Sequence, residues 1–290
     1  MSLEFYIVDV FAEEKLQGNQ LAVFRDRGVS SGLMQRIAKE MNFSETTFIT
    51  SVDDVDNVYG VRIFTPESEL PFAGHPTLGT AYVIKQELVK EKVDRVTLDM
   101  KVGPIPVDFT YKGDDPDILW MTQKPPVFGE EHPKNKFAEF LGLEQEDIDP
   151  EYPIQEVSTG VYFYMIPLAS REALEKVKID WENLNKYSEG TKAKWPHMFC
   201  RETENPDNHL KARMLTTFTE DPATGSANGC LAGYLVKHRY FDSPEIDVRV
   251  EQGAEVGRPS LLYLKANQKD PDIEVKVGGK CAMVARGEFL

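Results

Sequence analysis

The chain has 290 residues, a net charge of −15 and a hydrophobic content of 41%, which is ordinary for a soluble globular protein long enough to form two domains. It has no long basic run, which argues against a nucleic-acid partner because phosphate binding needs a positive surface. Its three cysteines are widely spaced, so we expect neither a disulfide framework nor a thiolate zinc site. No signal peptide or apolar membrane-spanning segment is recognisable, so we expect a cytoplasmic protein that does not bind a membrane.

In chain order, alternation of polar and apolar residues predicts strands much more often than helices. A helix is expected after Ser30 or Ser31, with Leu33, Ile37 and Met41 on one face. Two surface helices with charged outer faces are expected at residues 135–143 and 170–179. The strand patterns cover residues 4–11, 58–64, 96–109, 160–168, 246–253, 261–266 and 273–279.

An internal repeat organises the chain. Residues 69–84 align with residues 220–235 at an offset of 151 residues, and a repeat at such a distance indicates two related halves. The residues at 77–84 and 227–236 are small or apolar nearly all round, which is typical of a helix in a core, with a buried strand as the alternative. The identities in and before the repeat are Arg62/Arg213, Thr65/Thr216, Glu69/Glu220, Pro71/Pro222, Gly74/Gly225 and Ala81/Ala232.

These patterns predict an α+β fold with two pseudo-symmetric lobes. Each lobe is expected to be a strongly twisted, mainly antiparallel sheet wrapped around one central buried helix, with a cleft between the lobes. Prolines and acidic residues at 112–117 favour a lobe boundary there. We therefore expect an N-terminal lobe at residues 1–115 and a C-terminal lobe at 116–275, with the strand at 276–290 returning to the first lobe.

Both predicted central helices begin after the pattern Pro-x-x-Gly followed by a polar residue. That residue is His75 in the first copy and Ser226 in the second. Pro76 suits a first helical turn, and Ser226 suits an N-cap. Free backbone N–H groups and the helix dipole make each start a candidate site for a carboxylate, and plain helix capping is the alternative.

Two carboxylates are candidates for chemistry. Glu45, between the first helix and a strand, suits an acid–base role in a closed site, and simple solvation is the alternative. Asp221 is expected to bind an amine or hydroxyl of the substrate, or else to form local turn hydrogen bonds. The sequence lacks a phosphate-binding loop, a G-x-S-x-G elbow, H-E-x-x-H and G-x-G-x-x-G, so we expect no nicotinamide cofactor and no metal site.

Five motifs together resemble the PhzF family of phenazine-biosynthesis-like isomerases, which have the diaminopimelate epimerase-like fold. The resemblance runs nearly end to end, and it implies a two-lobed protein that forms a homodimer. One departure is GNQ near the N-terminus, where the family more often has G-N-P. The motifs are GNQLAVF at 18–24, NFSETTFI at 42–49, RIFTPESELPFAGHPTLGTA at 62–81, DPATGSANGC at 221–230 and QGAEVGRPS at 252–260.

The resemblance also implies roles for individual residues. The family isomerises dihydro-hydroxyanthranilate without a cofactor, and its catalytic glutamate falls on Glu45. In related epimerases, cysteines stand where this chain has His75 and Ser226, and Cys230 lies one turn further along, so a two-thiol mechanism is excluded. The residues expected to bind substrate are His75, Asp221, Ser226, Gly74, Gly225 and Asn19.

The functional hypothesis is a cofactor-independent isomerase. It would move a proton between carbons of a small, dihydro-hydroxyanthranilate-like carboxylic acid by general acid–base catalysis. One alternative is a two-base amino-acid epimerase in which Glu45 opposes Asp221 or His75. The other is a non-catalytic binding or scaffold protein of the same fold.

Overall fold

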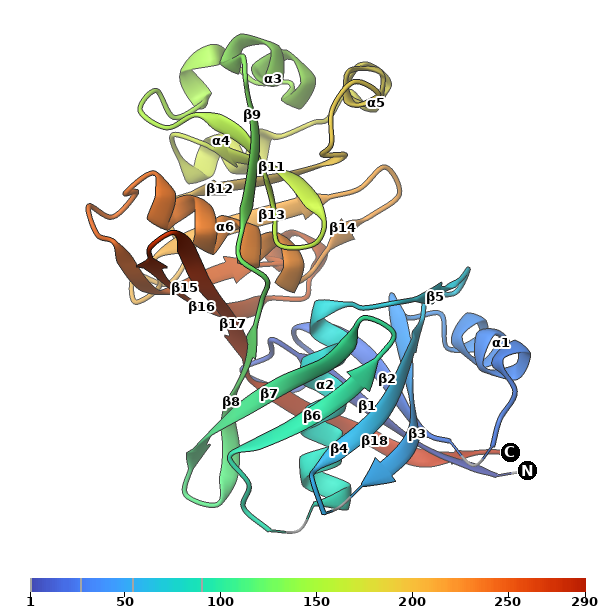
Figure 1. The fold of residues 1–290 in the computed structure, drawn as a ribbon. Helices are drawn as coiled ribbons and strands as arrows, with labels where there is room; N and C mark the ends of the chain where they lie inside the picture. Colours follow the sequence, from blue (N-terminus) through green and yellow to red (C-terminus); the bar gives the residue numbers. More distant parts are fainter. Residues whose placement is uncertain (1, 27, 54, 90) are drawn as a thin grey trace. The chain divides into compact units, whose positions relative to one another are not determined.

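The computed structural model describes residues 2–26, 28–53, 55–89 and 91–290, and the chain forms two compact units (Figure 1). Unit 1 comprises Met1–Thr122 together with Gly278–Leu290, and unit 2 comprises Gln123–Val277. The division falls after Thr122, whereas the sequence analysis placed the boundary after residue 115, inside what is strand β8.

Unit 1 is a sheet with one helix in its centre and one on its outer face. The outer helix, α1 (Ser31–Met41), is capped by Ser30, whose side chain accepts a hydrogen bond from the Leu33 amide. The central helix is α2 (Gly74–Val83), which continues into a π-helical turn, η1 (Ile84–Leu88). The strands are β1 (Leu3–Val10), β2 (Asn19–Arg25), β3 (Glu45–Asp53), β4 (Val58–Phe64), β5 (Glu69–Leu70), β6 (Arg95–Met100), β7 (Gly103–Lys112), β8 (Asp115–Thr122) and β18 (Cys281–Phe289).

Unit 2 repeats this plan with more helices on its outer face. Its central helix is α6 (Gly225–Lys237), and its outer helices are α3 (Lys134–Leu141), α4 (Arg171–Lys176) and α5 (Trp181–Ser188). Two short 3-10 turns are η2 (Gln145–Asp147) and η3 (Ala254–Val256). The strands are β9 (Val127–His132), β10 (Ile154–Ser158), β11 (Tyr162–Pro167), β12 (Trp195–Cys200), β13 (Leu210–Leu215), β14 (Glu220–Asp221), β15 (Glu245–Gln252), β16 (Ser260–Lys269) and β17 (Asp272–Gly279).

Strand pairing shows that the two units share one topology. In unit 1, β18, β1 and β2 pair antiparallel in that order, β2 pairs parallel with β3, and β3 pairs antiparallel with β4. Next, β4 pairs antiparallel with β5 and parallel with β6, which pairs antiparallel with β7. In unit 2, the strands β9 to β16 pair in the same order and with the same directions. The α+β fold of two pseudo-symmetric, mainly antiparallel lobes is confirmed.

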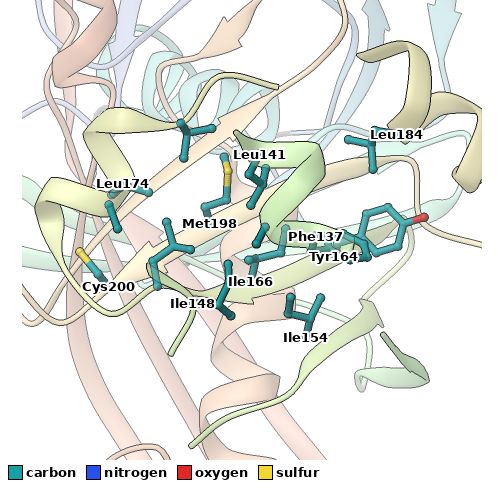
Figure 2. Close-up of a cluster of buried hydrophobic side chains, with 14 of the residues drawn as sticks. Phe137, Leu141, Ile148, Ile154, Tyr164, Ile166, Leu174, Leu184, Met198 and Cys200 are labelled. Carbon is teal, nitrogen blue, oxygen red and sulfur yellow. The ribbon is translucent and has the colours of Figure 1, made fainter. Parts of the chain in front are cut away.

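Buried strands in each unit pack on both faces. In β12, Met198 and Cys200 belong to a hydrophobic cluster under the outer helices, which Figure 2 shows, whereas Phe199 between them packs on Tyr234 of α6. Successive side chains of a strand point to opposite faces, so β12 separates the central helix from the outer helices. In unit 1, Phe48 likewise faces α1, while Thr47 bonds Thr80 of α2.

Both central helices are almost wholly buried, as their apolar sequences predict. Gly79 shows how closely the sheet of unit 1 approaches α2. A Cβ atom at this position would lie 2.6 Å from Leu21 and 2.7 Å from Val10, so a larger residue does not fit without movement. A small residue therefore lets the strands wrap around the helix.

Candidate functional site

A repeated ion pair braces the segment that leads to each central helix. In unit 1, Arg62 donates to both carboxylate oxygens of Glu69 at 2.7 and 2.8 Å. In unit 2, Arg213 donates to both oxygens of Glu220 at 2.8 Å each. The hydrogen bond from Arg62 lowers the pKa of Glu69 to about 2, with Lys101 adding to the effect. Each pair ties β4 or β13 to the short strand that precedes the helix start.

The start of α2 supplies the first set of candidate donors. The helix begins at Gly74 after Ala73, whose extended backbone makes it the N-cap. Pro76 lies in the first turn, as predicted, and it has no N–H to satisfy. Because the first N–H groups of a helix have no intrahelical acceptors, those of Gly74 and His75 are available at the positive end of the helix dipole.

Glu45 and His75 meet at this helix start. Glu45 is the first residue of β3, and its Oε2 lies 3.3 Å from Nε2 of His75. The orientation of this contact is not that of a hydrogen bond. Both side chains are largely enclosed, with 16% of Glu45 and 7% of His75 exposed. The structure thus brings together the predicted base and the polar residue of the first helix start.

Burial keeps the imidazole of His75 neutral. Desolvation lowers the pKa of His75 to about 3, and a hydrogen bond to the Gln20 backbone opposes this effect only in part. Since Nε2 faces Glu45, the bond to Gln20 uses the other ring nitrogen, Nδ1. A ring nitrogen must donate to a carbonyl, so Nδ1 carries the proton and Nε2 presents its lone pair.

Asn19 lies at the start of β2, directly before the residue that holds the His75 ring. It is buried, and it shares one strand face with Leu21, which packs against α2 at Gly79. Leu21 is also the register partner of Glu45 on β3. Asn19 therefore belongs to the same corner of unit 1 as the other predicted residues of this half.

The start of α6 differs in one respect from the prediction. The N-cap is Thr224, and Ser226 is the second residue of the helix, so the interpretation of Ser226 as an N-cap is wrong. Ser226 remains half-buried in the first turn, next to the buried Gly225. The Gly225 carbonyl accepts a hydrogen bond of 3.1 Å from Nε2 of Gln123, which fixes this peptide.

Asp221 ends β14 and lies just before this helix start. Its Oδ2 accepts a 2.7 Å hydrogen bond from the Thr224 hydroxyl, and its Oδ1 is 3.4 Å from the Ala223 amide. Asp221 is only half-buried. The carboxylate thus makes the local turn contacts that the sequence analysis named as an alternative. Its expected role in binding substrate stays a prediction.

Sequence reasoning assigned no role to two amides near the second helix start. Gln123 is held by Thr159, whose hydroxyl donates to Oε1 at 2.6 Å. Gln252 bonds the backbone of both Asp221 and Thr224. Gln252 lies in the QGAEVGRPS motif, so the sequence marked the position, but the contacts depend on register between distant segments.

Cys230 lies on α6 beyond the first turn of the helix. Burial raises the pKa of the Cys230 thiol to about 12, and this residue lies in the second turn of α6.

Across the described part of the chain, no helix has both the length and the apolar character needed to cross a bilayer.

Comparisons with known proteins agree with this architecture. Residues 8–287 match the family described as "Phenazine biosynthesis-like protein". The chain is 35% identical to trans-2,3-dihydro-3-hydroxyanthranilate isomerase of Pseudomonas aeruginosa, covering 98% of each chain. It is 34% identical to an uncharacterized isomerase of Clostridium acetobutylicum, covering 98% of this chain and 97% of that one.

A solved structure shows the same fold. The PhzF-family phenazine biosynthesis protein of Bacillus anthracis superimposes with a TM-score of 0.90 at 26% identity, covering 100% of this chain and 99% of that one. With a family match over nearly the whole sequence and isomerases among its relatives, the chain belongs to the PhzF family of phenazine biosynthesis-like proteins and is an isomerase.

Proposed function

We propose that this isomerase moves a proton between two carbons of a small, unsaturated carboxylic acid without a cofactor. Glu45 takes the proton from one carbon as a carboxylate and returns it to another carbon as the acid, so no atom is gained or lost. The observation that carries the proposal is the enclosed contact between Glu45 and the neutral His75 at the start of α2. A single carboxylate serving as base and then acid needs this kind of closed environment.

The neutral state of His75 supports this role for Glu45. A cationic imidazole 3.3 Å away would favour the ionised carboxylate at every stage and would oppose its protonation. His75 instead faces Glu45 with a lone pair, because its pKa lies near 3 and its proton is committed to Gln20. Glu45 is therefore able to change its charge within a catalytic cycle.

The substrate carboxylate is proposed to bind backbone N–H groups at the central helix starts. In an acidic protein with a net charge of −15, helix ends provide local positive charge without a cationic side chain. In unit 1 the groups concerned belong to Gly74 and His75, with Asn19 in the same corner of the unit. In unit 2 they belong to Gly225 and Ser226, and Asp221 beside them is proposed to accept a hydrogen bond from an amino or hydroxyl group of the substrate.

Two alternatives from the sequence analysis are weaker. A non-catalytic scaffold is not supported, since the chain is an isomerase. The two-base epimerase needs Asp221 or His75 as its second base. The low pKa of His75, about 3, makes its imidazole a weak base, and the Asp221 carboxylate accepts hydrogen bonds from Thr224 and Ala223 in its own turn.

The proposal is tested with trans-2,3-dihydro-3-hydroxyanthranilate, the compound in the name of the P. aeruginosa relative. Migration of a double bond changes its ultraviolet absorption, which gives a continuous assay. Glu45→Gln should lower turnover by ~10²–10⁴-fold and leave ligand binding nearly unchanged. Glu40→Gln, at an exposed site on α1, is the control and should retain full turnover.

Deuterium oxide separates isomerisation from epimerisation. Isomerisation shifts the ultraviolet spectrum and leaves any deuterium on the carbon that receives the proton. Epimerisation places deuterium on the α-carbon and changes the optical rotation without a spectral change. Turnover by Glu45→Gln above about a tenth of wild type would remove Glu45 from the proton transfer, since general acid–base groups contribute far more than that.

A further inference from the structure

Gln252 is a buried amide whose hydrogen-bonding capacity is fully used. It ends β15 and is 2% exposed. Its Nε2 donates to the Asp221 carbonyl at 2.8 Å and to the Thr224 hydroxyl oxygen at 3.0 Å. Its Oε1 accepts from the Asn228 side chain at 2.9 Å and from the Thr224 amide at 3.3 Å. Two donors and two acceptor positions are all that a glutamine side chain offers.

These bonds set the direction of the hydrogen bond between Thr224 and Asp221. Because Gln252 donates to the Thr224 oxygen, the proton of that hydroxyl points elsewhere, and Oδ2 of Asp221 lies 2.7 Å away to accept it. The chain Gln252–Thr224–Asp221 thus runs in one direction, and it ends on the carboxylate. Hydrogen bonds linked in this way strengthen one another in a low-dielectric setting.

Unit 1 has the same strand pairing and the same helix start without this network. Strand register makes Met100 at the end of β6 equivalent to Gln252 at the end of β15. The positions equivalent to Asp221 and Thr224 are Leu70 and Ala73, as the offset of 151 residues shows. A helix start can therefore be built without the polar network. The network occurs in unit 2, where Asp221 stands at the position that Leu70 has in unit 1.

The turn after Gln252 is anchored against the same segment. Gly253 has a φ of +82°, and a Cβ atom there would lie 2.4 Å from the Pro222 carbonyl oxygen, so only glycine fits. The buried Lys211 bonds Glu255 of the η3 turn at 2.8 Å. The turn after β15 is therefore held by the Lys211–Glu255 ion pair, and its Gly253 packs closely against Pro222.

We infer that Gln252 is a positioning residue, which holds the turn between Asp221 and Thr224 and orients the Asp221 carboxylate through the Thr224 hydroxyl. The inference rests on the proposed function for the role of Asp221 in binding an amino or hydroxyl group of the substrate. The geometric part of the inference does not depend on any activity, and it has its own test.

Hydrogen–deuterium exchange tests the geometric part in the whole protein. Gln252→Met places at this position the residue that unit 1 has there, and should speed exchange in peptides covering residues 221–228 by about tenfold. Gln268→Met, a half-buried glutamine on β16, is the control and should leave those peptides unchanged. Unchanged exchange in folded Gln252→Met would overturn the inference, whether or not the protein turns over the test compound.

Thr224 variants test the link to the carboxylate with the ultraviolet assay. Thr224→Val keeps the shape but removes the donor, and should raise KM by ~10-fold, since a hydrogen bond to a charged group contributes about that factor to an equilibrium constant. Thr224→Ser restores a hydroxyl and should restore KM. In an Asp221→Asn background, Thr224→Val should have little further effect, because contacting residues are not additive. Full additivity, or no rescue by serine, would show that Thr224 acts only on folding and would refute the link.

Discussion

Arg213 and Glu220 form a nearly buried, two-pronged ion pair, and Arg213 also donates a 2.8 Å hydrogen bond to the Leu174 carbonyl. The equivalent pair in unit 1, Arg62 and Glu69, is more exposed, with 27% and 17% of the side chains accessible against 10% and 11%. Two equivalent Arg–Glu pairs therefore differ in solvent exposure within one chain. The effect of burial on their contribution to stability can be measured by the same substitution in each pair.

We predict that Arg213→Met costs more stability than Arg62→Met. Removing Arg213 leaves a desolvated carboxylate and a carbonyl without its donor, a loss of about 3–5 kcal/mol for a buried pair. Removing Arg62 lets water reach Glu69, which limits the loss to about 1 kcal/mol. Urea denaturation of both variants measures the difference, and equal losses would contradict the burial argument.

A second prediction concerns the close approach of strands to α2. Gly79→Ala inserts a methyl group into the contact with Leu21 and Val10 and should cost about 1–3 kcal/mol of folding free energy. Gly32→Ala on α1 meets open space and should instead stabilise by about 0.5–1 kcal/mol, since alanine favours a helix. Thermal denaturation of the two variants should therefore shift Tm in opposite directions.

His197 predicts a pH-dependent stability. It is fully buried, neither ring nitrogen has a hydrogen-bond partner among the described residues, and desolvation lowers its pKa to about 3. Between pH 6.5 and 3 the unfolded chain binds this proton and the folded chain does not, so folding stability falls as pH falls, by up to ~1.4 kcal/mol per pH unit.

The measurement is urea denaturation of wild type and His197→Phe from pH 7.5 to pH 4.5. Replacing His197 removes its contribution to the pH dependence of the free energy of unfolding. As pH falls, the free energy of unfolding of the variant should therefore rise relative to that of wild type, by up to ~2–3 kcal/mol over this range. Using the difference between pH values cancels any packing change. A constant difference across the range would show that His197 does not titrate as predicted.

The absence of a cofactor from the proposed mechanism gives a further prediction. Proton transfer by Glu45 uses only groups of the chain, so dialysis against EDTA should leave turnover of the test compound unchanged. Metal analysis of the dialysed protein is the control for complete removal. Loss of turnover that added Mg²⁺ or Zn²⁺ restores would refute cofactor independence.

Much of the fold was predictable because its strongest signals are local. The buried helices α2 and α6 follow from segments that are apolar nearly all round, and the strand β15 from clear alternation. The strands β2 and β12 were missed because they are buried on both faces. Their sequences, NQLAVFR and WPHMFC, therefore lack the polar–apolar period that marks a half-exposed strand.

The sequence named candidate site residues but not the contacts that these residues make. The segment DPATGS contains two hydroxyl side chains, and the backbone places Thr224 rather than Ser226 at the N-cap position, where the Thr224 hydroxyl bonds Asp221 and makes no capping hydrogen bond. The pairing of Glu45 with His75 needs β3 to meet α2, and the resemblance to a family indicated both residues without that geometry. The bonds of Gln252 depend on register over about 30 residues, which no local pattern encodes.

The pairing of β1 with β18 has a consequence for truncation. Leu3 is the register partner of Phe289, so the sheet of unit 1 is joined from segments that lie far apart in the sequence. Unit 2 is formed by the continuous segment Gln123–Val277, so it does not need β18. A chain truncated before residue 281 should therefore keep a second half that resists protease, while its first half, including Glu45, loses an edge strand and is cleaved.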